Sequence, residues 1–161
     1  MAANALSILL FSGETDGSAL RYALKADAFS LNFVKTPIQT PLPQGGQPII
    51  LDFGHIRPTL TISGLVDTTA PGSTENQTGP TKDSSSTYTV PSKENLEDFV
   101  TSKFFDKNTQ PVEVILSDGT STSVAEYRGA ISQARFDLAP ATEDRFAFTL
   151  VFVCELRKSG T

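Results

Sequence analysis

The side chains that could carry out chemistry in this chain are few, and their spacing does not bring them together. The single histidine, His55, lies three residues after Asp52, a spacing that could supply two metal ligands or an acid–base pair. A metal site needs a third and a fourth ligand, and the sequence around this pair offers no cysteine and no second histidine. A turn that exposes both side chains to solvent explains the pair equally well. We therefore expect neither a metal site nor a catalytic site here.

Other reactive groups lack the surroundings that would activate them. The single cysteine, Cys154, belongs to an alternating apolar segment, so we expect a buried and unreactive thiol. No serine lies in a Gly-x-Ser-x-Gly context, and the segment 13–17 lacks the lysine of a phosphate-binding loop. The acidic residues of 67–83 are too widely spaced for a calcium loop. We predict that the protein is not an enzyme and binds no cofactor or metal.

Length and charge narrow the classes of partner. The chain has 161 residues, enough for one domain with its own core, and one cysteine excludes an internal disulfide. It carries 13 basic and 18 acidic side chains, a net charge of −5. Stable binding of nucleic acid needs clustered Lys and Arg, so we expect DNA at most to pass this protein. The apolar run 6–11 is too short to span a bilayer and predicts a strand in a protein made in the cytoplasm.

The elements that would position any site are mainly strands, and the clearest signal is the segment 145–157. Every second residue from Phe146 to Leu156 is apolar, which predicts a strand with one face in the core. The intervening residues are also partly apolar: Ala147, Thr149, Val151 and Val153. Such a strand is typical of the middle of a barrel or sandwich, or of a sheet that meets another subunit.

Further alternating segments predict strands over 6–11, 20–24, 29–34, 49–54, 59–66, 112–116 and 123–136. Asp118-Gly119 predicts a hairpin turn, and Gly129 predicts a bulge. One helix is expected over 92–105, capped by Ser92, with Leu96, Phe99, Val100 and Phe104 on one face. We predict a single, mainly β domain over 1–161: an antiparallel β-barrel or sandwich with one flanking α-helix.

Two segments interrupt this pattern. Prolines and glycines fill 35–48 and predict an extended arm, which either lies across a neighbour or is a plain surface loop. In 67–87, ten of the 21 residues are Ser or Thr, and Leu, Ile, Val and Phe are absent. A long polar loop over 67–90 is therefore expected to be mobile in an isolated subunit, and contact with a neighbour is one way to order it. Deletion of 70–86 should then leave the monomer folded.

Three ordered motifs resemble tail proteins of tailed bacteriophages. The first is Asp52-Phe-Gly-His-Ile-Arg57, followed by a strand that ends in Ser63-Gly64. The second is Pro91-Ser92-Lys93 before the short helix, and the third is Glu143-Asp144-Arg145 at the entrance to the closing aromatic strand. The resemblance covers about residues 48–157.

This resemblance implies a tail-tube-like β domain that assembles with itself into rings, expected to be hexamers. The rings would stack as the tail tube, or sit at its distal end as a tube initiator, distal tail or baseplate adaptor protein. It further implies a location in the virion tail, contacts with other tail or baseplate proteins, DNA only in transit through an acidic lumen, and no membrane insertion. The residues expected at subunit interfaces are Asp52, Arg57, Thr69, Thr74, Asn76, Lys82, Tyr88, Glu143, Asp144 and Arg145.

An alternative from another class is a carbohydrate-binding β-sandwich module. Such a module would normally display exposed Trp or Tyr side chains to stack on sugar rings. This chain has no Trp and three Tyr, which disfavours that alternative.

Overall fold

The computed structural model of the protein describes residues 6–13, 19–35, 37–40, 49–51, 56–105, 111–138 and 144–155. The described elements are β1 (Ser7–Ser12), β2 (Leu20–Leu24), β3 (Ala26–Lys35), β4 (Ile38–Thr40), β5 (Ile49–Leu51), β6 (Ile56–Asp67), a 3-10 turn η1 (Ser73–Glu75), β7 (Gln77–Lys82), β8 (Ser85–Tyr88), α1 (Lys93–Phe105), β9 (Val112–Ser117), β10 (Ser123–Leu138) and β11 (Arg145–Cys154). The prediction of a mainly antiparallel, barrel- or sandwich-like fold with one α-helix is confirmed.

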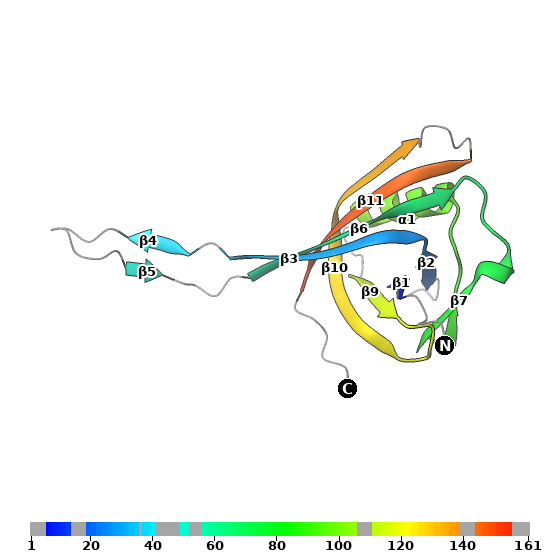
Figure 1. Cartoon of the computed structure of the whole chain (residues 1–161), viewed down its shortest axis with the longest axis horizontal. Helices are drawn as coiled ribbons and strands as arrows, with labels where there is room; N and C mark the ends of the chain where they lie inside the picture. Colours follow the sequence, from blue (N-terminus) through cyan, green and yellow to red (C-terminus); the bar gives the residue numbers. More distant parts are fainter. Residues whose placement is uncertain are drawn as a thin grey trace.

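Seven strands form one antiparallel sheet in the order β2-β1-β9-β10-β11-β6-β3. The long strand β10 belongs to both halves: residues 123–129 pair with β9, and residues 129–138 pair with β11. Figure 1 shows how strongly β10 curves, so that the two halves of the sheet face one another. We call them the β2 half (β2, β1, β9 and 123–129) and the β3 half (β3, β6, β11 and 129–138).

Gly129 sits where β10 passes from one half to the other, and it pairs with Val112 on one side and Cys154 on the other. A Cβ atom at this position would lie 2.6 Å from the Val153 carbonyl oxygen. The glycine therefore permits a close approach of two backbones. The bulge predicted at Gly129 was placed wrongly, because the shift in register lies between Ile131 and Gln133.

The main core fills the space between the two halves and α1. It explains the alternation seen in the closing strand, since every second residue of β11 points into it. Each fully buried apolar side chain contributes about 1.5–3 kcal/mol before entropic costs. The members include Ile8, Leu10, Leu60, Ile62, Leu96, Phe99, Val100, Val112, Val114, Phe148, Leu150, Phe152 and Cys154.

Helix α1 begins as the sequence predicts. The Ser92 hydroxyl accepts a hydrogen bond from the Asn95 backbone N–H at 3.1 Å, which satisfies one of the free donors of the first turn. The ring of Phe99 meets that of Tyr22 edge to face at 5.8 Å. The apolar face of the helix thereby closes one side of the main core, while the side chain of Phe104 lies outside the described part.

The polar segment 67–90, predicted as a long loop that is mobile in an isolated subunit, instead contains regular structure that packs on the sheet. It forms η1 and the β7–β8 hairpin, which covers the opposite face of the β2 half. Tyr88 is fully buried against Leu9, and its hydroxyl donates a hydrogen bond to the Pro80 carbonyl oxygen at 2.9 Å. A Cβ atom at Gly79 would lie 2.3 Å from the Leu9 side chain, so the missing side chain lets the hairpin close.

A second, smaller core results, with Leu9, Phe11, Ala23 and Ile115 from the β2 half and Tyr88 and Val90 from the hairpin side. The sequence did not predict this core, because its two members on the hairpin side, Tyr88 and Val90, follow directly after the Ser/Thr-rich segment 67–87. The composition of that segment therefore gives no sign of them.

The predicted arm is described in part. Residues 37–40 and 49–51 contain β4 and β5, which pair antiparallel from Ile38↔Leu51 to Thr40↔Ile49. This ribbon continues the direction of β3 and β6 and lies far from the rest of the sheet (Figure 1). Residues 41–48 of the predicted arm lie outside the described residues.

Candidate assembly surface

The β3 half has two strands with a hydrogen-bonded neighbour on one side only. β3 pairs with β6, and within the described residues no strand lies on its other side. Residues 130–138 of β10 pair with β11, whereas the pairing of β10 with β9 stops at Gly129. Each of these edges presents a row of backbone N–H and C=O groups that can pair with another strand.

The edge of the β2 half is different, because the chain covers it. The Ala23 N–H donates to the Thr89 carbonyl oxygen at 2.8 Å, and the Thr89 N–H donates to the Arg21 carbonyl oxygen at 3.1 Å. These bonds form a parallel bridge between Tyr22 and Thr89. The end of the hairpin therefore satisfies part of the β2 edge, and the two edges of the β3 half are the best candidates for contact with another chain.

The face of the β3 half that points away from the main core carries small and hydroxyl-bearing side chains. The paired rows through Thr59 and Thr61 contain only uncharged side chains: Ser30, Asn32, Thr59, Thr61, Ala130, Gln133, Val151 and Val153. Charged side chains on the same face begin in the rows beyond these, at Arg135 and Asp137, and further exposed acidic residues lie on α1, at Glu94, Glu97 and Asp98. The acidic lumen stays a prediction.

Charged side chains gather at one end of the β3 half. The Asp67 carboxylate lies 2.9 Å from the Lys25 ammonium and 3.0 Å from the Arg145 guanidinium, and Glu75 lies 2.6 Å from Lys25. A hydrogen bond from Lys25 and the nearby charges hold the pKa of Asp67 below its usual value. The pKa of Lys25 is raised, chiefly by its hydrogen bond to Glu75.

This network joins segments that are distant in the sequence. It connects η1, the residue between β2 and β3, and the first residue of β11. The Thr68 N–H also donates to the Asp144 carbonyl oxygen at 2.9 Å. Of the interface residues predicted from the closing motif, Asp144 and Arg145 thus lie together near Asp67. Arg145 and Asp67 also line a cavity of about 270 Å³.

Lys82 is held inside the subunit. Its ammonium group lies 2.8 Å from Glu113 and 3.6 Å from Glu126, on the two strands that the hairpin covers. Burial alone would lower the pKa of Lys82, but the hydrogen bond and charge of Glu113 outweigh it and raise the pKa. The Arg21 guanidinium donates to the Lys82 carbonyl oxygen at 2.8 Å. These contacts fasten the hairpin to the sheet.

The remaining predicted interface residues do not form one cluster. Thr69 and Thr74 are exposed and Asn76 is half-buried around η1, whereas Tyr88 is buried in the second core. Asp52, Glu143 and the side chain of Arg57 lie outside the described part. Sequence reasoning missed the two free edges, because alternation identifies a strand without indicating which strands lie at the end of a sheet.

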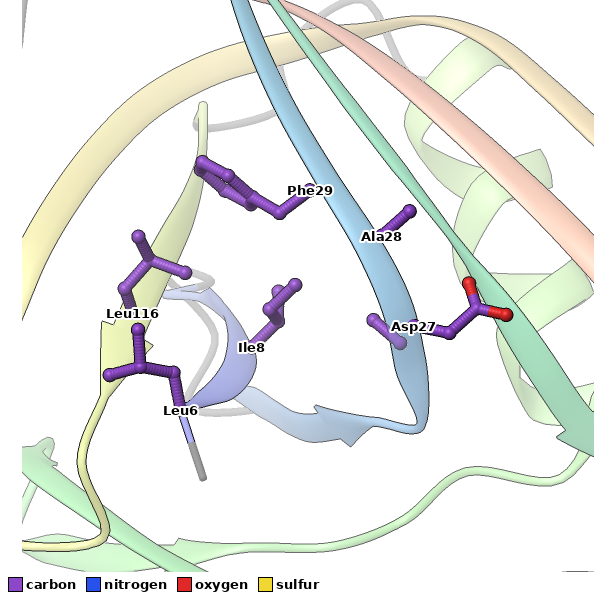
Figure 2. A pocket seen from close by; sticks show the side chains of 7 residues that line it. Leu6, Ile8, Asp27, Ala28, Phe29 and Leu116 are labelled. Carbon is purple, nitrogen blue, oxygen red and sulfur yellow. The ribbon is translucent and has the colours of Figure 1, made fainter. Parts of the chain in front are cut away.

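An open cavity of about 190 Å³ lies between the start of β3 and strands β1 and β9. In Figure 2, the side chains of Phe29, Ile8, Leu6 and Leu116 gather around it, and the Asp27 carboxylate points away from them. The cavity is apolar on the side of the β2 half and borders the free edge of β3. We call this gap between the edge of β3 and the β2 half the seam cavity.

The groups considered for chemistry give no reactive arrangement in the described part. Burial raises the pKa of Cys154 to about 11, so its thiol stays protonated at neutral pH, as expected for an unreactive core cysteine. Among the described residues, no three His, Cys, Asp or Glu side chains are grouped to hold a metal ion. Asp52 and His55 lie outside them. None of the described helices is long and apolar enough to cross a membrane.

Comparison with known proteins gives no match to a protein-family model. No curated protein sequence matches the chain either. Among solved structures, the chain is similar to a chain in the cryo-electron microscopy structure of the anti-feeding prophage baseplate, with a TM-score of 0.52 and 10% identity. That similarity covers 98% of this chain and 93% of the other.

Two further similar chains come from gene transfer agent particles. One is from the tail of the empty particle, with a TM-score of 0.44, 15% identity, and coverage of 95% of this chain and 96% of the other. The second is from the native virion, with a TM-score of 0.41, 15% identity, and coverage of 91% and 95%. The fold implied by the resemblance to tail proteins is confirmed by the first similarity: over nearly its whole length, the chain shares the fold of a chain in the anti-feeding prophage baseplate.

Proposed function

We propose that this chain is a structural subunit of a phage-like tail, which assembles with copies of itself head to tail into a ring. The observation that carries this proposal is the pair of free edges on the β3 half. Strand direction alternates across β3, β6, β11 and β10, so the two edge strands run in opposite directions. The free edge of β10 in one copy can therefore pair antiparallel with β3 of the next, and such a head-to-tail contact closes into a ring.

Six copies are our proposal for the ring. The similar baseplate structure was determined with six-fold symmetrisation, and the tail of the empty gene transfer agent particle has C6 symmetry. In such a ring, the face of the β3 half that points away from the main core would line the lumen. Because its central rows present no Lys or Arg, DNA could pass without being held by ion pairs to its phosphates.

The arm fits a role in contacts with neighbouring copies or with other tail proteins. The arm and the strand ends that lead into it expose large apolar side chains that a solitary ribbon would leave in water: Phe33, Val34, Ile38 and Ile50. Burial of such side chains against a neighbour would stabilise an assembly by removing apolar area from water.

Within the tail, we propose the tube as the first location, with rings that stack into a channel. A single ring of the baseplate, or a tube initiator or distal adaptor, is the second candidate. It is favoured by the similarity to a baseplate chain over 98% of this chain.

A carbohydrate-binding module gains no support from the fold. Tyr88 is buried, and Tyr22 and Tyr127 are half-buried against Phe99 and Phe29. No tyrosine therefore offers an exposed platform for a sugar ring. We also propose that the protein is not an enzyme. Retention of full assembly in a variant with both Asp52→Ala and His55→Ala would agree with this, whereas loss of a measurable hydrolytic activity in that variant would overturn it.

The proposal is tested by light scattering of the purified protein over a range of concentrations, combined with negative-stain electron microscopy. Rings with a central hole are the expected result, and stacked tubes would identify the tube rather than a single-ring location. A protein that stays monomeric at the highest concentration, alone and with its neighbouring tail proteins, would contradict ring assembly.

A further inference from the structure

The two free edges of the β3 half can be compared level by level through β11 and β6, which pair with each other without a register shift; the edge ladders each contain one shift, between Ile131 and Gln133 and between Ala26 and Ala28. One row runs from Arg135 through Thr149 and Ser63 to Ala28. The next row runs from Asp137 through Ala147 to Leu65, whose N–H donates to the Lys25 carbonyl oxygen at 3.1 Å. Arg135 therefore lies at the level of Asp27 and Ala28 on the opposite edge, and Asp137 lies at the level of Lys25.

The charges on the two edges follow the same order along the chain, with the cation before the anion. On one edge Lys25, which immediately precedes β3, comes before Asp27; on the other, Arg135 comes before Asp137. Because an antiparallel pair reads the two strands in opposite directions, an unshifted register sets unlike charges opposite one another. In the isolated subunit, Arg135 and Asp137 pair with each other at 2.7 Å, with 69% and 52% of their side-chain surfaces exposed. Asp27 is exposed and makes no ion pair within the described residues.

The core-facing sides of the same two edges are also complementary in shape and polarity. On the edge of β10, Leu138 is 63% exposed, and Phe136 beside it is half-buried. Both face the side of the sheet that carries Phe29 on β3, since their partners Phe148 and Phe146 are core or core-packed residues. On the edge of β3, the apolar seam cavity of about 190 Å³ is lined by Ala26 and Phe29, which lie at the levels of Phe136 and Ala134, whereas Leu138 lies two residues beyond.

We propose that the β10 edge of one copy pairs with the β3 edge of the next in the register that sets Lys25 opposite Asp137 and Asp27 opposite Arg135. In this register, Phe136 of one copy lies opposite Ala26 of its neighbour, so that its half-buried ring borders the seam cavity that Ala26 lines, and the exposed Leu138 lies two residues beyond. This inference rests on the proposed ring and adds to it a specific register and a specific residue at the seam cavity. It explains why the cavity of an isolated subunit is open and apolar beside a free strand edge.

Charge reversal tests the register. Asp27→Arg and Arg135→Asp each set like charges opposite one another at every interface, so each should raise the concentration needed for assembly by about tenfold or more. The combination of both reversals in one chain should restore assembly to within about threefold of the wild type, because the pair is again complementary. The matched control exchanges the exposed helix pair with Lys93→Glu and Glu97→Lys, which should leave assembly unchanged.

The possible results distinguish a wrong register from a wrong ring proposal. If the wild type forms rings and the double reversal is as defective as the single variants, the register is wrong and the ring stands. If the wild type never forms rings, the proposed function fails. Circular dichroism and thermal unfolding of each variant monomer should be unchanged, which excludes misfolding as the cause of a defect.

Disulfide cross-linking tests the placement of Phe136. An Ala26→Cys protein and a Phe136→Cys protein are mixed under assembly conditions and oxidised mildly, with the buried Cys154 left in place. We expect a covalent dimer containing one copy of each protein. A mixture of Ala26→Cys with Val124→Cys, which lies on the first part of β10, is the control and should stay monomeric. Rings without the Ala26–Phe136 cross-link would overturn the placement of Phe136 at the seam cavity.

Discussion

At the scale of single residues, Asp67 links two cations at the charged end of the β3 half. It accepts hydrogen bonds from both Lys25 and Arg145, which belong to segments far apart in the chain. Because Lys25 lowers the pKa of Asp67 in the folded state, the ionised carboxylate stabilises the fold. The sequence predicted Arg145 as an interface residue, but it could not identify Asp67 as its partner within the subunit, since 78 residues separate them.

We predict that Asp67→Asn lowers the free energy of unfolding by about 1 kcal/mol at pH 7, because two partly exposed ion pairs are lost. A carboxyl group with a lowered folded-state pKa stabilises the fold above its unfolded-state pKa, about 3.9. That contribution is lost as the pH falls through the folded value. Urea unfolding from pH 7 to pH 3 should therefore show the difference between wild type and variant shrinking below about pH 4. A difference that is independent of pH would contradict this role.

Gly129 gives a second residue-scale prediction. Gly129→Ala should destabilise the monomer by about 1–3 kcal/mol, because the new methyl group meets the Val153 carbonyl oxygen and the two strands must move apart. Gly72→Ala is the matched control, since a Cβ atom there would have no neighbour within 4 Å. Thermal unfolding of both variants measures the difference. Equal melting temperatures would show that the strands do not approach as closely as described.

At the scale of elements, most strands and the helix follow from the sequence. Alternation in 145–157 and 29–34, the Ser92 cap, and the Asp118-Gly119 turn are local signals, and each reports on a local conformation. The Asp118 carboxylate accepts hydrogen bonds from Thr120, and Gly119 has a φ of 86°, as the turn requires. The order of strands and the docking of the hairpin depend on long-range pairing, which no local pattern records.

The β7–β8 hairpin is the element for which sequence and structure differ most. We now expect deletion of 70–86 to destabilise the monomer rather than leave it folded, because Leu9, Phe11 and Ile115 would lose the hairpin that covers their face of the sheet. A polar segment can dock firmly on a sheet when one buried aromatic side chain and one ion pair hold it in place. Here those anchors are Tyr88 and the pairing of Lys82 with Glu113.

Tyr88→Ala should lower the free energy of unfolding by about 3–5 kcal/mol, the range for truncation of a fully buried aromatic side chain. The exposed neighbour in the same strand supplies the control, and Thr87→Ala should change stability by less than about 0.5 kcal/mol. Denaturant unfolding of the two variants is the measurement. A small effect of Tyr88→Ala would mean that the hairpin is not part of the folded unit.

At the scale of the whole molecule, the parts of the fold that cover each half of the sheet explain which surface is left for assembly. The hairpin covers one face of the β2 half, and the main core with α1 fills the space between the halves. Only the β3 half keeps an uncovered face and two free edges within the described part of the chain. The sequence indicated a half-apolar second face on its closing strand, but it could not show that this strand lies inside a sheet with two free ends.

Hydrogen exchange of backbone amides, compared between the monomer and the assembled protein, tests the ring most directly. The account predicts that assembly slows exchange in β3 and in residues 130–138 of β10, because these are the edges that gain hydrogen bonds to a neighbour. Amides of β9, which already pair on both sides, should not change. Protection gained at the β2 edge or on α1, with none at β3 and β10, would contradict edge-to-edge assembly.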